Sequence, residues 1–237
     1  SGKGAIARML HSRSLRKNGR FVVLTCATLS EDTLEQALFG IEATKSHPRR
    51  IGVLEEAHGG TLLLDEVADM DMATQLKMVR VLHNRRFQRI GGDTVVEVNS
   101  RVLATTTRDL QALIAEGKFR EDLFYRLNVV PIHAPPLSDR REDIPLLAVH
   151  LMERSAAAKS RSPRILGADA LTALQGHDWP GNVWELSNVM ERLLLMAPGG
   201  SQDHIHAEAV GQAIGAAAGT ASRWDHAPEV MSLPLRE

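Results

Sequence analysis

The chain has 237 residues, a formal net charge of −1 and an aromatic fraction of 4%. This length fits one sizeable core with a smaller satellite, because single domains run to roughly 100–200 residues. Balanced charge and few aromatic side chains exclude the basic footprint of a dedicated nucleic-acid binder and the stacking surface of a single-strand binder.

Cysteine usage and hydropathy indicate the compartment. The single cysteine, Cys26, excludes an intramolecular disulfide and fits a reducing compartment. It follows the apolar run Phe21–Thr25, so we expect a buried structural thiol and not a nucleophile. No apolar run approaches the length of a membrane span and no signal peptide is visible, so we predict a cytoplasmic protein without a membrane partner.

The first residues have the composition of a truncated phosphate-binding loop. Gly2, Lys3 and Gly4 precede a helical pattern whose apolar face consists of Ala5, Ile6, Met9 and Leu10. Glycine lets backbone N–H groups approach phosphate, and a lysine at a helix start pairs with the outer phosphate oxygens. The full motif needs an earlier glycine and the chain lacks an initiating methionine, so we expect a fragment; a terminus without function is the alternative.

An apolar strand that ends in two carboxylates follows further along the chain. Gly59-Gly60 leads into Thr61–Leu64, and Asp65 and Glu66 come directly after it. Buried strands avoid charge, and in an open parallel sheet ligands bind at the carboxyl ends of the strands. Asp65 there would hold Mg²⁺ directly or through water, and Glu66 would orient a water for attack on phosphate. An acidic turn without function is the alternative at this point.

The segments around this strand alternate between helix and strand patterns. The sequence predicts a strand from Phe21, a helix over 32–39 that ends at Gly40, and a polar surface loop over 41–51. An amphipathic helix follows, with Met72, Leu76, Val79 and Leu82 on its inner face and Gln75, Lys77 and Arg80 on other faces. Residues 87–90 and 94–98 flank Gly91-Gly92-Asp93 as a β-hairpin.

The next segments predict a second strand that ends in polar residues, followed by two arginine side chains. Arg101–Thr107 reads as a strand that ends in polar residues, in the same geometry as Asp65. Arg120 and Arg126 lie six residues apart around an acidic pair, as surface ion-pair partners or as guanidinium groups offered to phosphate. Residues 129–132 read as the last strand.

From residue 135 onward the patterns are helical. Residues 144–158, 167–175 and 181–196 predict three helices, the last with Val183, Leu186, Val189, Met190, Leu193 and Leu194 facing inward. After Gly199-Gly200 the composition favours a linker with a weak helical patch, in which His204 and His206 are a solvated pair. We therefore predict an α/β unit over 1–134, a small all-α unit over 135–198 and a linker over 199–237.

This order of elements resembles the AAA+ central domain of sigma-54-dependent bacterial transcription activators, the NtrC-like response regulators, and most closely the NtrX type. The most specific strings are 59–66, 87–92, 119–127, 135–137 and Trp179-Pro180-Gly181-Asn182-Val183. The resemblance covers nearly the whole chain. It implies a P-loop parallel sheet sandwiched by helices, followed by a helical lid, and it disfavours a metabolic P-loop kinase.

The resemblance also implies an ATPase with Mg²⁺ as cofactor. Gly2, Lys3 and Gly4 would end the Walker A loop, with Lys3 on the outer phosphates. Asp65 would be the Mg²⁺-associated Walker B acid and Glu66 the water-orienting base. Thr106-Thr107 would occupy the sensor I position, where many relatives have Asn in place of Thr107. Arg120 and Arg126 would be arginine fingers that act in trans on a neighbouring subunit's ATP, each contributing a factor of about 10³–10⁵ in rate.

Partners follow from the same resemblance. It implies a ring-forming homo-oligomer of a two-component response regulator, with a receiver domain for a cognate sensor kinase upstream and a DNA-binding helix-turn-helix domain downstream, neither of them in this chain. RNA polymerase is a further partner. Relatives that touch sigma-54 carry the motif GAFTGA after the Leu-Phe-Gly that is here Leu38-Phe39-Gly40, whereas this chain has Ile41–Ser46. We therefore do not expect remodelling of sigma-54 polymerase.

Two further departures bear on activity. The lid motif usually carries an arginine, the sensor II cation, where this chain has Trp184. An indole supplies neither a full positive charge nor a bidentate fork. The other departure is the truncated phosphate-binding loop. Loss of two backbone N–H donors from this loop, at roughly 1.5–3 kcal/mol each, would weaken ATP binding by this fragment about a hundredfold or more. The alternative function is therefore an ATP-sensing oligomerisation module of a DNA-binding response regulator with little hydrolysis.

Overall fold

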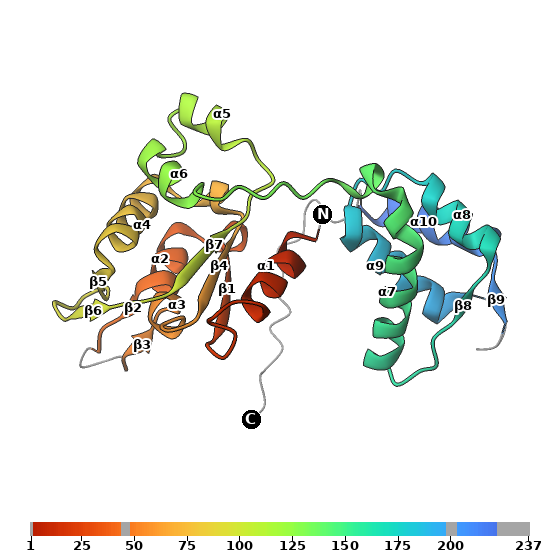
Figure 1. Cartoon of the computed structure of the whole chain (residues 1–237), viewed down its shortest axis with the longest axis horizontal. Coiled ribbons are helices and arrows are strands. Elements are labelled where there is room, and N and C mark those ends of the chain that lie inside the picture. The colour runs from red at the N-terminus through yellow and green to blue at the C-terminus, as the bar shows by residue number, and fades with distance from the viewer. Residues whose placement is uncertain (1, 44–47, 198–202, 222–237) are drawn as a thin grey trace. The chain divides into compact units, whose positions relative to one another are not determined.

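The computed structural model describes residues 2–43, 48–197 and 203–221. These residues form two compact units (Figure 1). One unit comprises Lys3–His133, and the other comprises Gly2 together with the chain from Ala134 onward. Each unit has its own hydrophobic core.

A parallel three-stranded sheet organises the first unit, as the sequence predicts. Strand β4 (Thr61–Asp65) lies between β1 (Phe21–Thr25) and β7 (Arg101–Ala104), and it pairs in parallel with both. Residues Leu62, Leu63 and Leu64 are buried, as expected for a central strand that is covered on both faces. The apolar run therefore ends where its two carboxylates reach the carboxyl edge of the sheet.

Six α-helices accompany this sheet in the described part of the first unit. They are α1 (Lys3–Ser12), α2 (Glu31–Phe39), α3 (Val53–Glu56), α4 (Met72–Asn84), α5 (Leu110–Ala115) and α6 (Glu121–Leu127). Short 3-10 turns follow β1 and β4, at Cys26–Thr28 and Val67–Asp69. The apolar faces of the helices and the sheet close one core, to which Leu34, Leu38, Met78, Leu113 and Leu123 contribute.

The inner face of α4 differs from the sequence prediction by one residue. Met78 and Val81 are buried with Thr74 and Gln75, whereas Met72 is 42% exposed. The other three residues of the predicted inner face are only half-buried. Gln75, predicted on another face, is fully buried because its side-chain amide has tertiary partners. Tertiary hydrogen bonding thus rotates the helix away from the face that apolar periodicity favours.

Helix α1 shows a similar difference. Ala7 and His11 are its buried residues, while Ala5 and Met9 of the predicted apolar face are exposed. The His11 ring nitrogen Nδ1 lies 2.9 Å from Thr61 Oγ1 on β4. This buried polar contact docks the helix on the central strand.

The Gln75 amide joins two loops of the first unit. Its Nε2 donates to the Met70 carbonyl at 2.7 Å and to the Lys118 carbonyl at 3.2 Å, and its Oε1 accepts from the Arg120 amide at 2.8 Å. Met70 ends the loop that follows β4, and Arg120 precedes α6. One buried side chain therefore fixes the distance between these loops.

We predict that Gln75→Leu lowers the free energy of unfolding by about 2–4 kcal/mol, because a buried carbonyl or amide without a partner costs about 1–3 kcal/mol. Denaturant unfolding followed by circular dichroism measures the change. Lys77→Ala on the same helix is the matched control, since Lys77 forms a surface ion pair with Glu35 and such pairs contribute about 0–1 kcal/mol. Equal stability of the two variants would contradict the role of the Gln75 amide.

The predicted β-hairpin is present, and the loop before β4 is more ordered at its ends than predicted. Strands β5 (Arg86–Gln88) and β6 (Val95–Glu97) pair in antiparallel fashion. Within the predicted surface loop, β2 (Gly40–Ile41) and β3 (Arg50–Ile51) form an antiparallel pair, and residues 44–47 lie outside the described part. The prediction of an irregular loop is therefore wrong at both of its ends.

Arg89 ties this segment to the hairpin. Its guanidinium is 6% exposed and donates to both Glu42 and Glu55 at 2.9–3.0 Å. The hydrogen bond from Arg89 holds the pKa of the Glu42 carboxyl below its usual value. Backbone bonds from the Glu42 amide to the Ile90 carbonyl and from the Ile90 amide to the Gly40 carbonyl, both 3.0 Å, complete the connection. The segment and the hairpin are thus held together.

The predicted strand over 129–132 is not formed. Val129, Val130 and Ile132 are 74%, 76% and 57% exposed, and their backbone is irregular. A strand needs a hydrogen-bonding neighbour, and among the described residues β7 pairs only with β4, which leaves no strand beside residues 129–132. Apolar, β-branched composition alone is therefore insufficient here.

The second unit is helical, as predicted. Helices α7 (Ile144–Ala158), α8 (Ala168–Gly176), α9 (Asn182–Met196) and α10 (Ala207–Ala221) pack around one core, preceded by 3-10 turns at Leu137–Asp139 and Arg141–Asp143. The two-residue strands β8 (Ile165–Leu166) and β9 (His204–Ile205) pair in parallel. Trp179 is buried and its indole N–H donates to the Leu174 carbonyl at 2.8 Å.

The predicted linker from residue 199 is corrected over the described residues 203–221. Helix α10 contacts α8 and α9, and Ile205, Val210 and Ala213 are buried in the second core. A composition rich in alanine and glycine favours a linker, but contact with α8 and α9 stabilises the helix. His206 lies 3.2 Å from the Asp169 carboxylate, and the described residues contain no cluster of three or more metal-ligating side chains.

Across the described ranges, no helix is both long and apolar enough to cross a lipid bilayer.

Candidate functional site

The two acids lie where β4 leaves the core. Asp65 is the last residue of β4, and Glu66 follows it with φ 56° and ψ 59°. This left-handed conformation is uncommon for a residue other than glycine, and strain of this kind costs about 1–3 kcal/mol. The partners described next maintain this conformation.

Thr105 contacts both acids. Its hydroxyl donates to Asp65 Oδ1 at 2.5 Å and accepts from the Glu66 amide at 3.2 Å. Its backbone extends the sheet ladder beyond β7, with the Thr105 amide bonded to the Leu64 carbonyl and the Val67 amide bonded to the Thr105 carbonyl. The sequence prediction missed Thr105, although it lies in the predicted strand; the β4–β7 register is the signal that identifies it.

The two predicted threonines have different roles. Glu66 Oε2 accepts from the Thr107 amide at 2.8 Å and from the Thr107 hydroxyl at 2.9 Å. The Thr106 hydroxyl turns away and bonds the backbone of Arg108. Thr106 reaches the site only through its carbonyl oxygen, which accepts from Lys3 Nζ at 2.6 Å.

Lys3 brings a cation to the acids. It is the first residue of α1, and its Nζ lies 3.6 Å from Glu66 Oε1. The first amides of a helix have no intrahelical partner, so the α1 N-terminus offers N–H donors beside this ammonium group. Gly2 has φ +89°, which favours glycine, whereas Gly4 is exposed and a Cβ at that position would meet no atom within 4 Å.

The donor set suits Mg²⁺. Asp65 has one oxygen bonded to Thr105 and a second oxygen available, and the described residues hold no group of three metal-ligating side chains. Mg²⁺ commonly keeps several waters and takes one or two protein carboxylates together with phosphate oxygens. A single carboxylate at the carboxyl edge of the sheet therefore fits Mg²⁺ better than it fits Zn²⁺, which needs several protein ligands.

Cys26 is a buried thiol, as predicted. Burial is the main reason that its pKa is raised to about 12, and the negative charges of Asp65, Asp69 and Glu66 raise it further. The thiolate is therefore disfavoured, which excludes a nucleophilic role at neutral pH.

We predict that Cys26 reacts with iodoacetamide at pH 8 far more slowly in the folded protein than in guanidinium, because a pKa of about 12 in place of 9.0 lowers the thiolate fraction about 10³-fold. Quantitative mass spectrometry measures the labelling. Because the folded pKa is raised, the protonated thiol contributes stability below pH 9 that is lost as pH rises from about 9 to 12. Cys26→Ala should remove that loss, and equal labelling of folded and unfolded protein would contradict the assignment.

The two predicted arginines are occupied by neighbours other than the acids. Arg120 bonds Asp122 at 3.0 and 2.7 Å, a pairing that raises the pKa of the guanidinium and lowers the pKa of the carboxyl. Arg126 Nη2 donates to His83 Nδ1 at 2.8 Å. Neither arginine has a hydrogen bond or ion pair with Asp65 or Glu66 in the described structure, so the chain does not bring them to its own acids.

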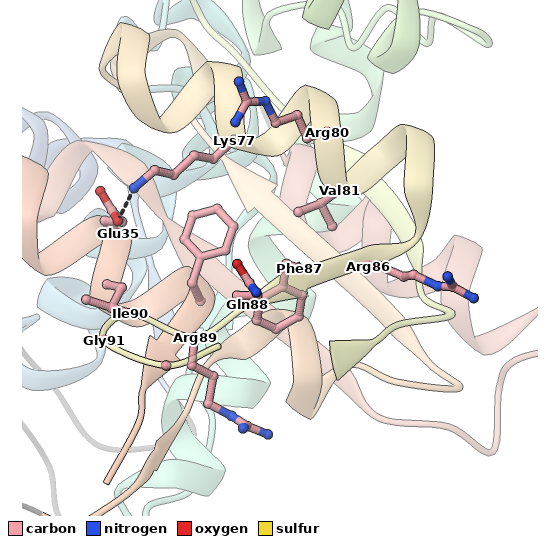
Figure 2. Close-up of a pocket in the computed structure, with 12 residues that line it drawn as sticks. Glu35, Lys77, Arg80, Val81, Arg86, Phe87, Gln88, Arg89, Ile90 and Gly91 are labelled. Carbon is pink, nitrogen blue, oxygen red and sulfur yellow. Dashed lines mark hydrogen bonds and ion pairs between the residues drawn. The ribbon is translucent and has the colours of Figure 1, made fainter. Parts of the chain in front are cut away.

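A hollow of about 410 Å³ lies elsewhere, between α2, α4 and the hairpin. Figure 2 shows Lys77 reaching Glu35 across it, while the guanidinium groups of Arg86 and Arg89 point away from the Phe87 ring. None of the predicted site residues lines it. Its basic side chains do not converge, so we assign it no part in the site.

Trp184, which occupies the expected sensor II position, lies on α9. Its side chain is 75% exposed, unlike Trp179 in the core of the same unit. The indole is therefore presented to solvent on the helical unit and does not contribute to the core.

Comparisons with known proteins identify the family of the chain. Residues 1–133 match the family model of the sigma-54 interaction domain, and residues 138–225 match that of the AAA+ ATPase lid domain. The chain is 45% identical over 237 residues to the nitrogen assimilation regulatory protein NtrX of Azorhizobium caulinodans, covering 100% of this chain and 52% of that protein. It is 46% identical to the regulatory protein AtoC of Escherichia coli, covering 84% of this chain and 44% of AtoC.

Solved structures show the same likeness. NtrX from Brucella abortus in complex with ADP has a TM-score of 0.82 and 44% identity, covering 91% of this chain and 48% of that one. The same protein in complex with ATP has a TM-score of 0.80 and 44% identity, covering 90% and 49%. The chain thus spans about half the length of these relatives. It belongs to the sigma-54-dependent AAA+ activator family of bacterial transcription regulators, and its similarity to NtrX extends over the whole chain.

Proposed function

We propose that the intact protein binds and hydrolyses ATP as the AAA+ module of a bacterial two-component response regulator of the nitrogen-regulation type, which controls transcription in the cytoplasm. The observation that carries the proposal is the convergence of Lys3, Asp65, Glu66 and Thr107 at the carboxyl end of the central strand. The crystal structures of Brucella abortus NtrX in complex with ADP and with ATP support nucleotide binding by the family.

Different residues of the chain would bind the phosphates and Mg²⁺. Lys3 and the first amides of α1 would hold the outer phosphates of ATP, which requires Lys3 to exchange Glu66 and the Thr106 carbonyl for phosphate oxygens. Asp65 would hold Mg²⁺ directly or through water. When bound, Mg²⁺ neutralises the charge that develops on the phosphate oxygens.

Glu66 would orient the attacking water. Its carboxylate is fixed by two bonds from Thr107, so one oxygen is held while the other faces Lys3. Preorganised groups of this kind accelerate reaction because no reorganisation is needed as charge develops. The Thr107 side chain is shorter than the Asn of many relatives, but its amide and its hydroxyl both donate hydrogen bonds to Glu66.

We predict that Glu66→Gln in the intact protein retains nucleotide binding and reduces turnover at least about 10²-fold, since an amide cannot accept the proton of the attacking water. Fluorescent ATP-analogue binding and steady-state phosphate release measure the two properties. Gln keeps an oxygen that can accept from Thr107, so the local fold is maintained. Unchanged turnover would contradict the assignment of Glu66.

Arg120 and Arg126 are proposed to act in trans. Both are surface groups held by Asp122 and His83 and not by the acids of their own chain. A neighbouring subunit of a ring would bring ATP to them, and such a finger contributes about 10³–10⁵ in rate. ATP would then lie between subunits, which makes turnover depend on assembly.

We predict that ATPase activity per subunit rises steeply with protein concentration and that Arg126→Ala lowers it at least about 10²-fold. Mixing this variant with Glu66→Gln subunits should restore part of the activity, because each supplies the group that the other lacks. Arg80→Ala on α4 is the control, as Arg80 lines the separate hollow. Activity that is independent of concentration and unaffected by Arg126→Ala would contradict action in trans.

A second candidate is an ATP-sensing oligomerisation module with little hydrolysis. Trp184 favours it, because the exposed indole cannot replace the sensor II cation. ATP-dependent assembly without concentration-dependent turnover would select this candidate.

Partners beyond the chain are proposals from the family. They are a sensor kinase through a receiver domain, promoter DNA through a helix-turn-helix domain, and RNA polymerase. The segment that begins at Ile41 lacks the GAFTGA motif, and on this basis we propose that sigma-54 is not remodelled.

A further inference from the structure

We propose that Thr105 is a positioning residue that orients Asp65 toward Mg²⁺ and holds Glu66 in its left-handed conformation. The proposal rests on the proposed ATPase function and extends it to a residue outside the predicted site. It is carried by the two hydrogen bonds that a single hydroxyl makes to adjacent acidic residues.

The direction of both bonds is determined by chemistry. The Glu66 amide can only donate, so it uses a lone pair of the Thr105 oxygen at 3.2 Å. The hydroxyl proton is then left for Asp65 Oδ1, at 2.5 Å. A hydroxyl bonded to a carboxylate at this distance is a charge-assisted hydrogen bond, roughly twice as strong as a neutral one.

The bond to Asp65 decides which carboxylate oxygen is available. Oδ1 is held by Thr105, and rotation of the carboxylate would break that bond. Oδ2 is left as the oxygen that can meet Mg²⁺ or a water bound to it. Threonine is suited to this task because its β-branch restricts χ1 and keeps the hydroxyl in place.

The hydrogen bond from the Glu66 amide to Thr105 acts on the residue that would orient the attacking water. Its backbone is held at φ 56°, and this turn directs the side chain to Thr107 and Lys3. The same hydroxyl therefore positions both the residue that would bind Mg²⁺ and the residue that would orient the attacking water, and its loss should affect both functions.

The role is separable from the fold. The Thr105 backbone keeps its bonds to Leu64 and Val67 whatever its side chain, so the sheet ladder does not need the hydroxyl. Thr105→Val replaces the hydroxyl by a methyl group at nearly constant shape, and Thr105→Ser retains the hydroxyl. Thr172→Val on α8 is the control, because that hydroxyl bonds only the Ala168 carbonyl of its own helix.

The test measures binding of a fluorescent ATP analogue to the intact protein against Mg²⁺ concentration, together with kcat and KM. For Thr105→Val we expect the Mg²⁺ concentration at half-maximal binding to rise about tenfold, as for loss of one bond to a charged group. We expect unchanged binding in EDTA and a fall in kcat that exceeds any change in KM. Thr105→Ser should restore both properties, and Thr172→Val should match the wild type.

An unchanged Mg²⁺ dependence in Thr105→Val would overturn the proposal, as would equal loss of binding with and without Mg²⁺. If Thr105→Val does not fold, Thr105→Ala carries the same expectation, because it deletes the hydroxyl without placing a methyl beside the carboxylate. Absence of turnover in the wild type would overturn the proposed ATPase function alone, since the Mg²⁺ dependence of binding tests Thr105 independently.

Discussion

The first unit depends on one constraint, which is that a strand buried through Leu64 is followed directly by two acidic side chains. Charge at the edge of an apolar core is costly unless it is paired and hydrogen-bonded. Here Asp65 accepts a hydrogen bond from Thr105, and Glu66 is held by Thr107 and Lys3. The two threonines follow β7, which lies beside β4 in the parallel sheet, and Lys3 begins α1. The arrangement that stabilises the acids is thus also the one on which their proposed role toward phosphate depends.

The acids themselves could be predicted from the sequence, because a leucine run that stops at Asp-Glu has few structural explanations. Their partners could be predicted only in part. Which of three consecutive threonines faces Asp65 depends on the pairing of Leu64 with Ala104, and register between strands distant in sequence is a tertiary property. Likewise, Gln75 is a polar residue by composition and a core residue by its three backbone partners, so apolar periodicity placed α4 one residue out of register.

The other incorrect predictions from the sequence have a common physical origin, which is that the tertiary neighbours of a segment cannot be read from its own residues. Residues 129–132 have strand composition, but a strand is a pairing of two segments, and no described strand pairs with them. Helix α10 is the opposite case: its composition, rich in alanine and glycine, favours a linker, yet contact with α8 and α9 buries Val210 and Ala213. Helices α7 and α9 could be predicted almost to their end residues from local sequence alone.

The left-handed backbone of Glu66 has a consequence for how the protein can change. Glycine is the residue that this conformation prefers, and replacing a strained residue by glycine relieves about 1 kcal/mol. Selection for thermal stability alone would therefore move position 66 away from the glutamate that is proposed to orient the attacking water. Under the proposed function, a glutamate at this site would reflect a trade between stability and activity. Laboratory evolution for higher thermal stability would encounter this conflict at position 66.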